Sequence, residues 1–216
     1  MPQLKGLIVD YGGVLTSPLE ETVAAWMRAD GVDPAEFAVL MRRWLDPGAA
    51  ANPVHGLETG ALPAAEFEHL LAAELQRAGG GRLAATGLLS RMLGGFRPAA
   101  PMLTVVATAR AAGIRTALLS NSWGLDYPRE GWPELFDAVV ISGEVGMRKP
   151  DEKIYRYTAG LLGLRTEECV FVDDLAHNVR AAVALGMVGV HHARCESTVA
   201  ELKALFGLAG DDHCDD

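Results

Sequence analysis

The amino-acid sequence predicts an α/β protein in which a parallel β-sheet lies between two layers of helices, with a small all-helical region inserted after the first strand. Two observations predict this fold. In the second half of the chain, short apolar runs rich in β-branched residues alternate with segments of helical periodicity, as in parallel sheets. Between the first apolar run and the others lies a long stretch whose periodicity is almost wholly helical.

Five apolar runs are expected to form the sheet. Each is short and ends at a polar residue or a glycine, which is typical of strands that are buried on both faces. The runs cover residues 4–10, 114–120, 138–142, 169–173 and 188–191. Because connections between parallel strands are right-handed crossovers, we expect the intervening helices on both faces of the sheet.

The segments before and between the later runs supply the helices of the core. They cover residues 98–112, a short stretch around Leu135, and residues 151–162 and 176–185. Gly113 and Gly186 follow apolar helices at positions where a left-handed C-terminal cap is favoured. Asp151 follows Pro150, and we expect its carboxylate to accept the free backbone N–H groups of the helix that begins there.

The all-helical region is expected over residues 18–96. Its helical segments cover residues 20–28, 34–45, 63–77 and 83–93, with turns at 46–48 and 79–81. The expected domains are a core of residues 1–17 and 97–210, the helical region of residues 18–96, and an acidic, disordered tail at residues 211–216. Helical spacing favours the region's own core, rather than a substrate pocket, for Trp26, Met27, Met41 and Trp44.

The composition narrows the function. Half of the 216 residues are hydrophobic and 22% are charged, which predicts a folded globular protein. The net charge of -9 argues against nucleic acid as a partner, because binding a phosphate backbone needs clustered Lys and Arg. We find no signal peptide and no apolar run of the ~20 residues that span a membrane. The cysteines indicate neither a metal site nor a disulfide framework, so we expect a cytoplasmic protein; they are Cys169, Cys195 and Cys214.

Polar residues stand at the ends of the predicted strands. They are Asp10 at the first, Ser120-Asn121 at the second, Arg148-Lys149 in the loop after the third, and Asp173-Asp174 at the fourth. Because the C-terminal ends of parallel strands face one crevice, we expect these side chains to converge. Carboxylates gathered there repel one another unless a cation neutralises them. A few hard oxygen ligands suit Mg²⁺, so the sequence predicts a magnesium site.

A carboxylate in such a site can act as a nucleophile toward phosphorus. The product is an aspartyl-phosphate that water later cleaves. Attack by an anion on a phosphate dianion needs nearby positive charge, which Mg²⁺ and Lys149 would supply. The hydroxyl of Ser120 and neighbouring backbone N–H groups would hold the phosphoryl oxygens. The expected partner is therefore a small phosphorylated molecule.

Four segments resemble the ordered motifs of the haloacid dehalogenase superfamily, in its subfamily IA form. They are Asp10-Tyr-Gly-Gly-Val-Leu15, Leu118-Leu-Ser-Asn-Ser122, Gly146-Met-Arg-Lys-Pro-Asp151 and Val170-Phe-Val-Asp-Asp174. The resemblance implies a Rossmann-like core, and residues 18–96 are similar to the type 1 cap, which closes over the crevice and selects substrates. It also implies a role for each strand-end residue: Asp10 as nucleophile and metal ligand, Ser120, Asn121 and Lys149 as phosphate-binding or charge-stabilising residues, and Gly12, Asp173 and Asp174 at the metal.

One position departs from the family's pattern. Phosphatases that the chain resembles usually carry a second Asp two residues after the nucleophile, and this sequence has Gly12 there. Glycine can offer its backbone carbonyl to the metal but has no proton to give. Because losing a positioned general acid slows a reaction by about 10²–10⁴-fold, we expect weak activity biased toward good leaving groups. Candidate replacements are Glu20, Glu21 and His55, whereas His177 is expected on a helix rim.

Three functions stay open at this stage. The first is a Mg²⁺-dependent phosphatase acting on a small phosphorylated metabolite. The second is a binding or regulatory protein that turns over slowly or not at all, which Gly12 supports. The third is a carbon–halogen hydrolase, because dehalogenases of the family also lack the second Asp and carry a Ser-Asn pair, although the pair Asp173-Asp174 argues against it. No motif identifies the substrate or the oligomeric state.

Overall fold

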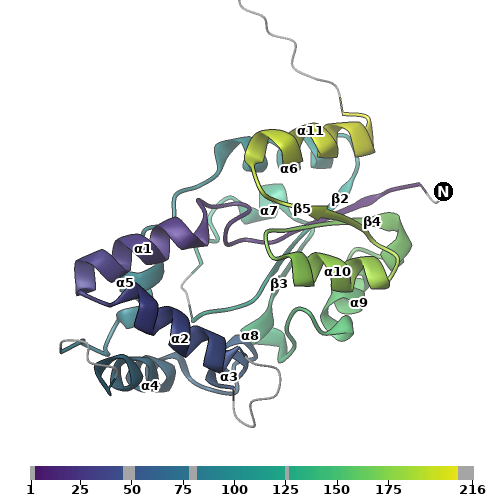
Figure 1. Ribbon diagram of the computed structural model, residues 1–216. Coiled ribbons are helices and arrows are strands. Elements are labelled where there is room, and N and C mark those ends of the chain that lie inside the picture. Colours follow the sequence, from purple (N-terminus) through teal and green to yellow (C-terminus); the bar gives the residue numbers. More distant parts are fainter. Residues whose placement is uncertain (1–2, 46–51, 78–81, 125–126, 209–216) are drawn as a thin grey trace, which may run out of the picture.

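A five-stranded parallel sheet forms the centre of the computed structural model, which describes residues 3–45, 52–77, 82–124 and 127–208. The strand order is β3-β2-β1-β4-β5, so β1 lies in the middle (Figure 1). The strands are β1 (Gly6–Val9), β2 (Arg115–Ser120), β3 (Ala138–Ile141), β4 (Cys169–Asp173) and β5 (Val188–His191). All five predicted strands are present, and their ends differ from the prediction by at most two residues.

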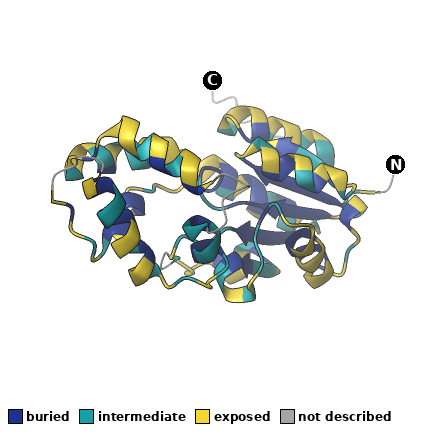
Figure 2. Ribbon diagram, turned by 60° about the horizontal axis from the view of Figure 1, so that its bottom comes forward, coloured by how far each residue is buried: buried dark blue, intermediate teal, exposed yellow. Residues whose placement is uncertain are grey.

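Helices cover both faces of this sheet, which confirms the three-layer α/β fold. Successive residues of β1 point to opposite faces, so Leu7 packs with the helices of one layer and Ile8 with those of the other. One layer contains α6 (Ala100–Ala111) and α11 (Cys195–Phe206), and the other contains α9 (Glu152–Leu161) and α10 (Ala176–Ala184). The strands are buried between the two helix layers. The outward-facing surfaces of the helices are exposed (Figure 2).

Short helices complete the core. They are α7 (Trp132–Leu135), α8 (Ser142–Val145) and the 3₁₀ helix η1 (Thr166–Glu168). Gly113 and Gly186 have φ angles of 86° and 87°, which confirms the predicted left-handed caps. Asp151 precedes α9 as predicted, but its side chain makes no capping hydrogen bond. That part of the prediction is wrong; Asp151 is exposed, so water can solvate the free N–H groups instead.

The segment between β1 and β2 folds into helices with a hydrophobic core of their own. The helices are α1 (Leu19–Asp30), α2 (Pro34–Trp44), α3 (Pro53–Glu58), α4 (Ala64–Arg77) and α5 (Leu88–Leu93). Trp26 and Trp44 are buried in this core, as predicted, and Met27 and Met41 pack against it. The predicted turns at 46–48 and 79–81, and the predicted tail at 211–216, lie outside the described residues.

Two contacts connect this helical region to the sheet. Where the chain leaves and re-enters the core, Thr16 and Pro98 form an antiparallel bridge. On the opposite side, the hydroxyl of Ser142 donates to the backbone carbonyl of Glu58, and the Arg148 Nε atom lies 2.5 Å from Glu58 Oε2. The helical region is therefore held against the C-terminal end of the sheet at two places.

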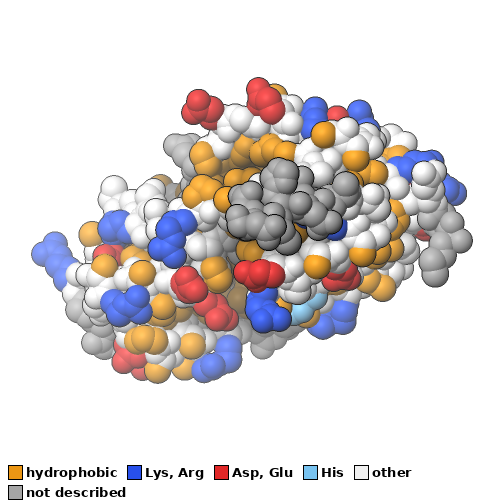
Figure 3. Space-filling model, turned by 90° about the horizontal axis from the view of Figure 1, so that it is seen from above, with side chains coloured by type: hydrophobic (Ala, Val, Ile, Leu, Met, Phe, Trp, Pro, Cys, Tyr) orange, Lys and Arg blue, Asp and Glu red, His pale blue; other side chains and the backbone are white. Residues whose placement is uncertain are grey.

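Charges are mixed over the surface. On the face drawn in Figure 3, the described Lys and Arg side chains are scattered among Asp and Glu side chains rather than gathered in one patch. Among the described residues, no helix is both long enough and apolar enough to span a membrane.

Candidate active site

Three carboxylates meet at the C-terminal end of the sheet. Asp10 directly follows β1, while Asp173 ends the neighbouring strand β4 and Asp174 follows it. Each carboxylate offers an oxygen atom, and these three atoms lie within 4.8 Å of one another. Asp10 and Asp173 are buried, and Asp174 is half-buried. Residues separated by more than 160 positions in the sequence therefore form one acidic cluster, as the strand-end argument predicts.

Lys149 lies between two of these carboxylates. Its Nζ atom is 2.7 Å from Asp10 Oδ1 and 2.7 Å from Asp173 Oδ2, and it also donates to the backbone carbonyl of Leu119 at 3.0 Å. The side chain of Lys149 is only 1% exposed. The three carboxylates of the cluster thus share one buried ammonium group, which leaves negative charge uncompensated within the cluster.

The pKa values reflect this imbalance. Burial raises the pKa of Asp10 to about 7, with the charges of Asp173 and Asp174 adding to the rise and Lys149 opposing it. Burial, together with the charge of Asp173, raises the pKa of Asp174 to about 6. Burial alone would lower the pKa of Lys149, but the two adjacent carboxylates outweigh it and raise the pKa. Additional positive charge would therefore stabilise the ionised cluster.

The two consecutive aspartates differ in their surroundings. Both oxygens of Asp173 are already paired: Oδ1 accepts from the backbone N–H of Leu175, Oδ2 from Lys149, and both from the amide of Asn178. The side chain of Asp173 is fully buried. Asp174, in contrast, lines the cavity next to Asp10. Asp173 is therefore placed to hold Lys149, while Asp174 is placed to meet a ligand in the cavity.

Ser120 ends β2 and Asn121 follows it beside the cluster, and both residues line the cavity. The hydroxyl of Ser120 lies 3.0 Å from the hydroxyl of Tyr127. The Asn121 side chain pairs with the backbone of Lys149, since Nδ2 donates to its carbonyl at 3.0 Å and Oδ1 accepts from its N–H at 2.8 Å. Asn121 therefore also orients the loop that carries Lys149, a function that the sequence did not indicate.

The two glycines after Tyr11 are not equivalent. A Cβ atom at Gly12 would meet only Phe96 Cζ, at an ordinary contact distance of 3.7 Å. A Cβ atom at Gly13 would lie 2.4 Å from Asp174 Oδ2, and Gly13 has a φ angle of 75°. Gly13 is thus required by the close approach of the chain to Asp174. At Gly12 the structure leaves room for a side chain.

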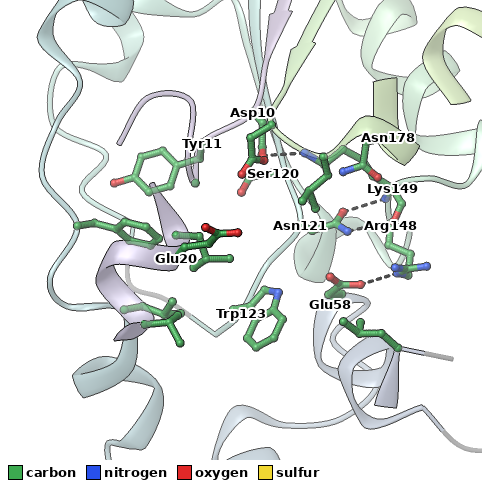
Figure 4. A pocket seen from close by; sticks show the side chains of 18 of the residues that line it. Asp10, Tyr11, Glu20, Glu58, Ser120, Asn121, Trp123, Arg148, Lys149 and Asn178 are labelled. Atoms are coloured by element: carbon green, nitrogen blue, oxygen red, sulfur yellow. Dashed lines mark hydrogen bonds and ion pairs between the residues drawn. The ribbon is translucent and has the colours of Figure 1, made fainter. Parts of the chain in front are cut away.

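A cavity of about 410 Å³ opens from the cluster toward the helical region (Figure 4). The sheet side contributes Asp10, Gly12, Ser120, Asn121, Lys149 and Asp174, together with His177 and Asn178 of α10. Of the candidate replacement acids, Glu20 lines the cavity, and Figure 4 shows its carboxylate pointing inward. Glu21 and His55 are not among the lining residues. His177 is exposed, in agreement with the predicted rim position.

Other lining residues were not singled out by the sequence. Trp123 and Tyr127 come from the segment after β2, and Glu58 comes from α3, where it pairs with Arg148. The position of Trp123, directly after the strand-end pair and Ser122, is a signal that could have identified it. Glu58 carries no such signal, because its approach to the cavity depends on how the helical region packs against the sheet.

Comparison with known proteins assigns the family. Residues 4–186 match the haloacid dehalogenase-like hydrolase model. A sesquiterpene phosphatase of Aspergillus oryzae is 35% identical over 133 residues, covering 59% of this chain and 66% of the relative. A phosphatase of Mycobacterium tuberculosis is 29% identical over 196 residues, covering 85% of each chain.

The solved structures agree in fold. The magnesium complex of a HAD family enzyme from Bacteroides thetaiotaomicron superimposes with a TM-score of 0.66 at 19% identity, over 88% of this chain and 94% of that one. Of the curated relatives that it matches, this chain covers a tenth of the length of one and 66% of the length of another. The match over most of its length and the shared fold show that this protein belongs to the haloacid dehalogenase-like hydrolases.

Proposed function

We propose that this hydrolase is a Mg²⁺-dependent phosphatase that acts on a small phosphorylated molecule through an aspartyl-phosphate on Asp10. The observation that carries the proposal is the cluster of Asp10, Asp173 and Asp174 around Lys149 at the base of a cavity. The two relatives named as phosphatases support the reaction class. We further propose that residues 18–96 act as a cap over this site.

The residues present fit a magnesium ion. The carboxylates of Asp10 and Asp174 face the cavity, and their charge exceeds what Lys149 neutralises. Asn178 Oδ1 is buried and has no hydrogen-bond partner among the described residues, so it can accept from a water that Mg²⁺ retains. We propose Asp10, Asp174 and the backbone carbonyl of Gly12 as ligands, with Asp173 positioning Lys149. The ion would supply positive charge for the phosphoryl oxygens.

In the first chemical step, an oxygen of the Asp10 carboxylate attacks phosphorus. A bond forms between this oxygen and phosphorus, the bond from phosphorus to the leaving oxygen breaks, and its electron pair departs with that oxygen. Lys149, 2.7 Å from Asp10 Oδ1, orients the nucleophile and offsets the charge of the phosphoryl group. The Ser120 hydroxyl, whose partner is Tyr127, donates to a phosphoryl oxygen.

In the second step, water attacks the phosphorus of the aspartyl-phosphate. The bond between Asp10 and phosphorus breaks, which regenerates the carboxylate and releases inorganic phosphate, and the proton lost by water goes to phosphate or solvent. Gly12 offers no side chain to protonate the leaving oxygen in the first step or to accept a proton in the second. We therefore propose that turnover is slow for alkyl phosphates and faster for aryl phosphates, acyl phosphates and anhydrides.

The test is a panel of phosphate esters assayed with Mg²⁺ and with EDTA, using wild type and Asp10→Asn. We expect Mg²⁺-dependent release of phosphate from 4-nitrophenyl phosphate, and a loss of at least about 10³-fold in Asp10→Asn, which keeps the shape but removes the nucleophile. Asp30→Asn, a carboxylate at the end of α1 that pairs with Arg91, is the matched control and should keep its activity. Equal rates for wild type and Asp10→Asn would refute the proposal.

Two results would indicate the other functions. Binding of inorganic phosphate with no detectable turnover of any ester would favour a binding or regulatory protein, which the glycine at position 12 supports. Release of halide from a haloacid in the presence of EDTA would indicate carbon–halogen hydrolysis. The acidic pair at the end of β4 argues against that reaction, because a small haloacid needs no metal.

A further inference from the structure

The wall of the cavity that comes from the helical region is almost entirely apolar. Its side chains include Leu19 and Val23 of α1, Phe37 and Met41 of α2, Leu93 of α5 and Phe96. Trp123, from the segment after β2, packs against the core of the helical region and lines the same part of the cavity (Figure 4). In the proposed reaction, the leaving group of the substrate would be held against this apolar wall.

Apolar side chains on both sides of the cavity are exposed. Leu19 is 37% exposed and Leu175, which follows Asp174, is 44% exposed, and both line the cavity. Exposed leucines on opposite sides of one cavity form a surface that an apolar ligand would cover. Burying such surface is favourable, whereas a polar ligand would leave it without a matching partner.

Two sets of polar groups near this wall are already paired. Arg148 and Glu58 form an ion pair at 2.5 Å, and their side chains are only 13% and 8% exposed. Both ends of the Asn121 amide bind the backbone of Lys149. Among the described lining residues of the helical region, Glu20 is the one polar side chain without a recorded ion-pair or hydrogen-bond partner.

A sugar or nucleotide is a poor match for such a wall. Each hydroxyl or base edge that enters without a partner gives up its hydrogen bonds to water, and one unpaired polar group weakens binding by roughly tenfold or more. A single carboxylate can accept from only a few such groups. The cavity volume of about 410 Å³ suits a compact ring system or a short branched chain, since small-molecule sites span about 300–1,000 Å³.

We infer that the substrate is either an aryl phosphate ester or a phosphate anhydride of a branched hydrocarbon, and that its apolar group binds against the helical region and Trp123. The inference rests on the proposed phosphatase function, because it assigns the leaving group of that reaction. Sugar phosphates and nucleotides are excluded as preferred substrates.

The kinetic test uses phenyl, 4-ethylphenyl and 4-butylphenyl phosphate with Mg²⁺. The leaving phenolates have nearly the same basicity, so differences in kcat/KM report contacts with the apolar group. We expect kcat/KM to rise by up to about fourfold for each methylene until the cavity is filled. If kcat/KM stays constant or falls as the alkyl group lengthens, the inference is overturned.

Variants locate the effect in the wall. Met41→Gln and Leu19→Gln each place an amide against the apolar group and should reduce the ratio of kcat/KM between 4-butylphenyl and phenyl phosphate by about tenfold. The control is Val39→Gln, which changes an exposed apolar side chain on α2, the helix that carries Met41. The Val39 side chain does not line the cavity, so this variant should leave the ratio unchanged. An unchanged ratio in both wall variants, with thermal unfolding like that of wild type, assigns the preference elsewhere and overturns the inference.

A binding experiment separates this inference from the proposed function. The matching 4-alkylphenyl phosphonates have a phosphorus–carbon bond that the proposed steps do not cleave, and calorimetry reports their affinity directly. If 4-nitrophenyl phosphate is hydrolysed but neither series depends on the alkyl group, the substrate class is wrong and the phosphatase proposal stands. If no ester is hydrolysed but phosphonate affinity rises with the alkyl group, the apolar site stands and the phosphatase proposal fails.

Discussion

The two walls of the cavity differ in how their side chains are held. On the sheet side, charged groups at the ends of strands and in the loops that follow them pair directly, as Lys149 does with Asp10 and Asp173. On the helical side, apolar side chains from α1, α2 and α5 line the cavity, and the Glu58–Arg148 pair is turned to connect the helical region with the core. Under the proposed function, the residues at the end of the sheet carry out the reaction, and the helices select the organic group of the substrate.

The largest expected effect concerns the side chain missing from the sheet wall. Gly12→Asp should raise kcat/KM for alkyl phosphates by about 10²–10⁴-fold, because it restores a carboxyl group able to protonate the leaving oxygen. The backbone tolerates a Cβ atom here, since a Cβ atom at Gly12 meets only Phe96 Cζ at 3.7 Å. Initial rates on a short alkyl phosphate and on 4-nitrophenyl phosphate measure the gain, which should be greater for the alkyl ester.

Gly12→Asn is the matched control, because it has nearly the same shape and no acidic proton. If Gly12→Asn gained as much activity as Gly12→Asp, the effect would come from packing rather than from proton transfer. Gly13→Asp is expected to be destabilised instead, because its side chain would occupy the position of the Asp174 carboxylate.

The next effect concerns the ion pairs of the sheet wall. Lys149→Met should lower the free energy of unfolding of the metal-free protein by about 3–5 kcal/mol, since removing one partner of a buried ion pair leaves uncompensated charge. Urea denaturation in EDTA measures this change, and added Mg²⁺ should restore part of it. Lys5→Met breaks an exposed pair with Glu168 and should change stability far less, because exposed ion pairs contribute little. If both variants lost a similar free energy of unfolding, the buried ion pair would contribute no more to stability than the exposed one.

A smaller effect is expected from pH. The raised pKa values of Asp10, about 7, and Asp174, about 6, mean that protons compete with a cation for the cluster. Affinity for Mg²⁺ should therefore fall on the order of tenfold between pH 8 and pH 6, as measured by calorimetry. Metal-free protein should respond in the opposite sense. Because the folded-state pKa of Asp10 lies above its ordinary value of 3.8, folding favours the protonated form, and stability is lost as pH rises toward 7.

Asp10→Asn provides the control for the pH experiment. Without the carboxyl group at position 10, the stability of the metal-free protein should vary less between pH 5 and pH 8. An unchanged slope would assign the pH dependence to other groups.

The two walls also differ in how much of them the sequence predicts. Asp10, Ser120 and Asp173 were placed correctly because parallel strands bring their C-terminal ends to one edge whatever the intervening chain does. The cavity-facing position of Glu58 could not be predicted, because it depends on contacts between α3 and the loop that carries Arg148.

Helix boundaries also depend on local contacts that the sequence pattern does not reveal. Helix α5 begins at Leu88 rather than residue 83, since Gly87 has a φ angle of 71° and the helix cannot extend back through it. Helix α11 was not predicted. Its N-cap residue is Arg194, which makes no side-chain capping hydrogen bond, so the usual start signal is missing. Local capping chemistry thus limits what periodicity alone can locate.

The smallest effect is expected at Glu20, the one carboxylate among the described residues of the helical wall that has no ion-pair or hydrogen-bond partner. Glu20 lies in the first turn of α1, where a negative charge is favourable next to the helix N-terminus, and this explains its presence without a catalytic role. Glu20→Gln should therefore keep kcat/KM on a short alkyl phosphate within about threefold of wild type, whereas loss of a working general acid would lower it by about 10²–10⁴-fold, because an alkoxide needs a proton to depart. Glu21→Gln, which changes the next residue and does not affect the cavity lining, is the matched control. A large loss confined to Glu20→Gln would show that the helices supply a proton as well as the apolar wall, and the division of labour between the two walls would then be wrong.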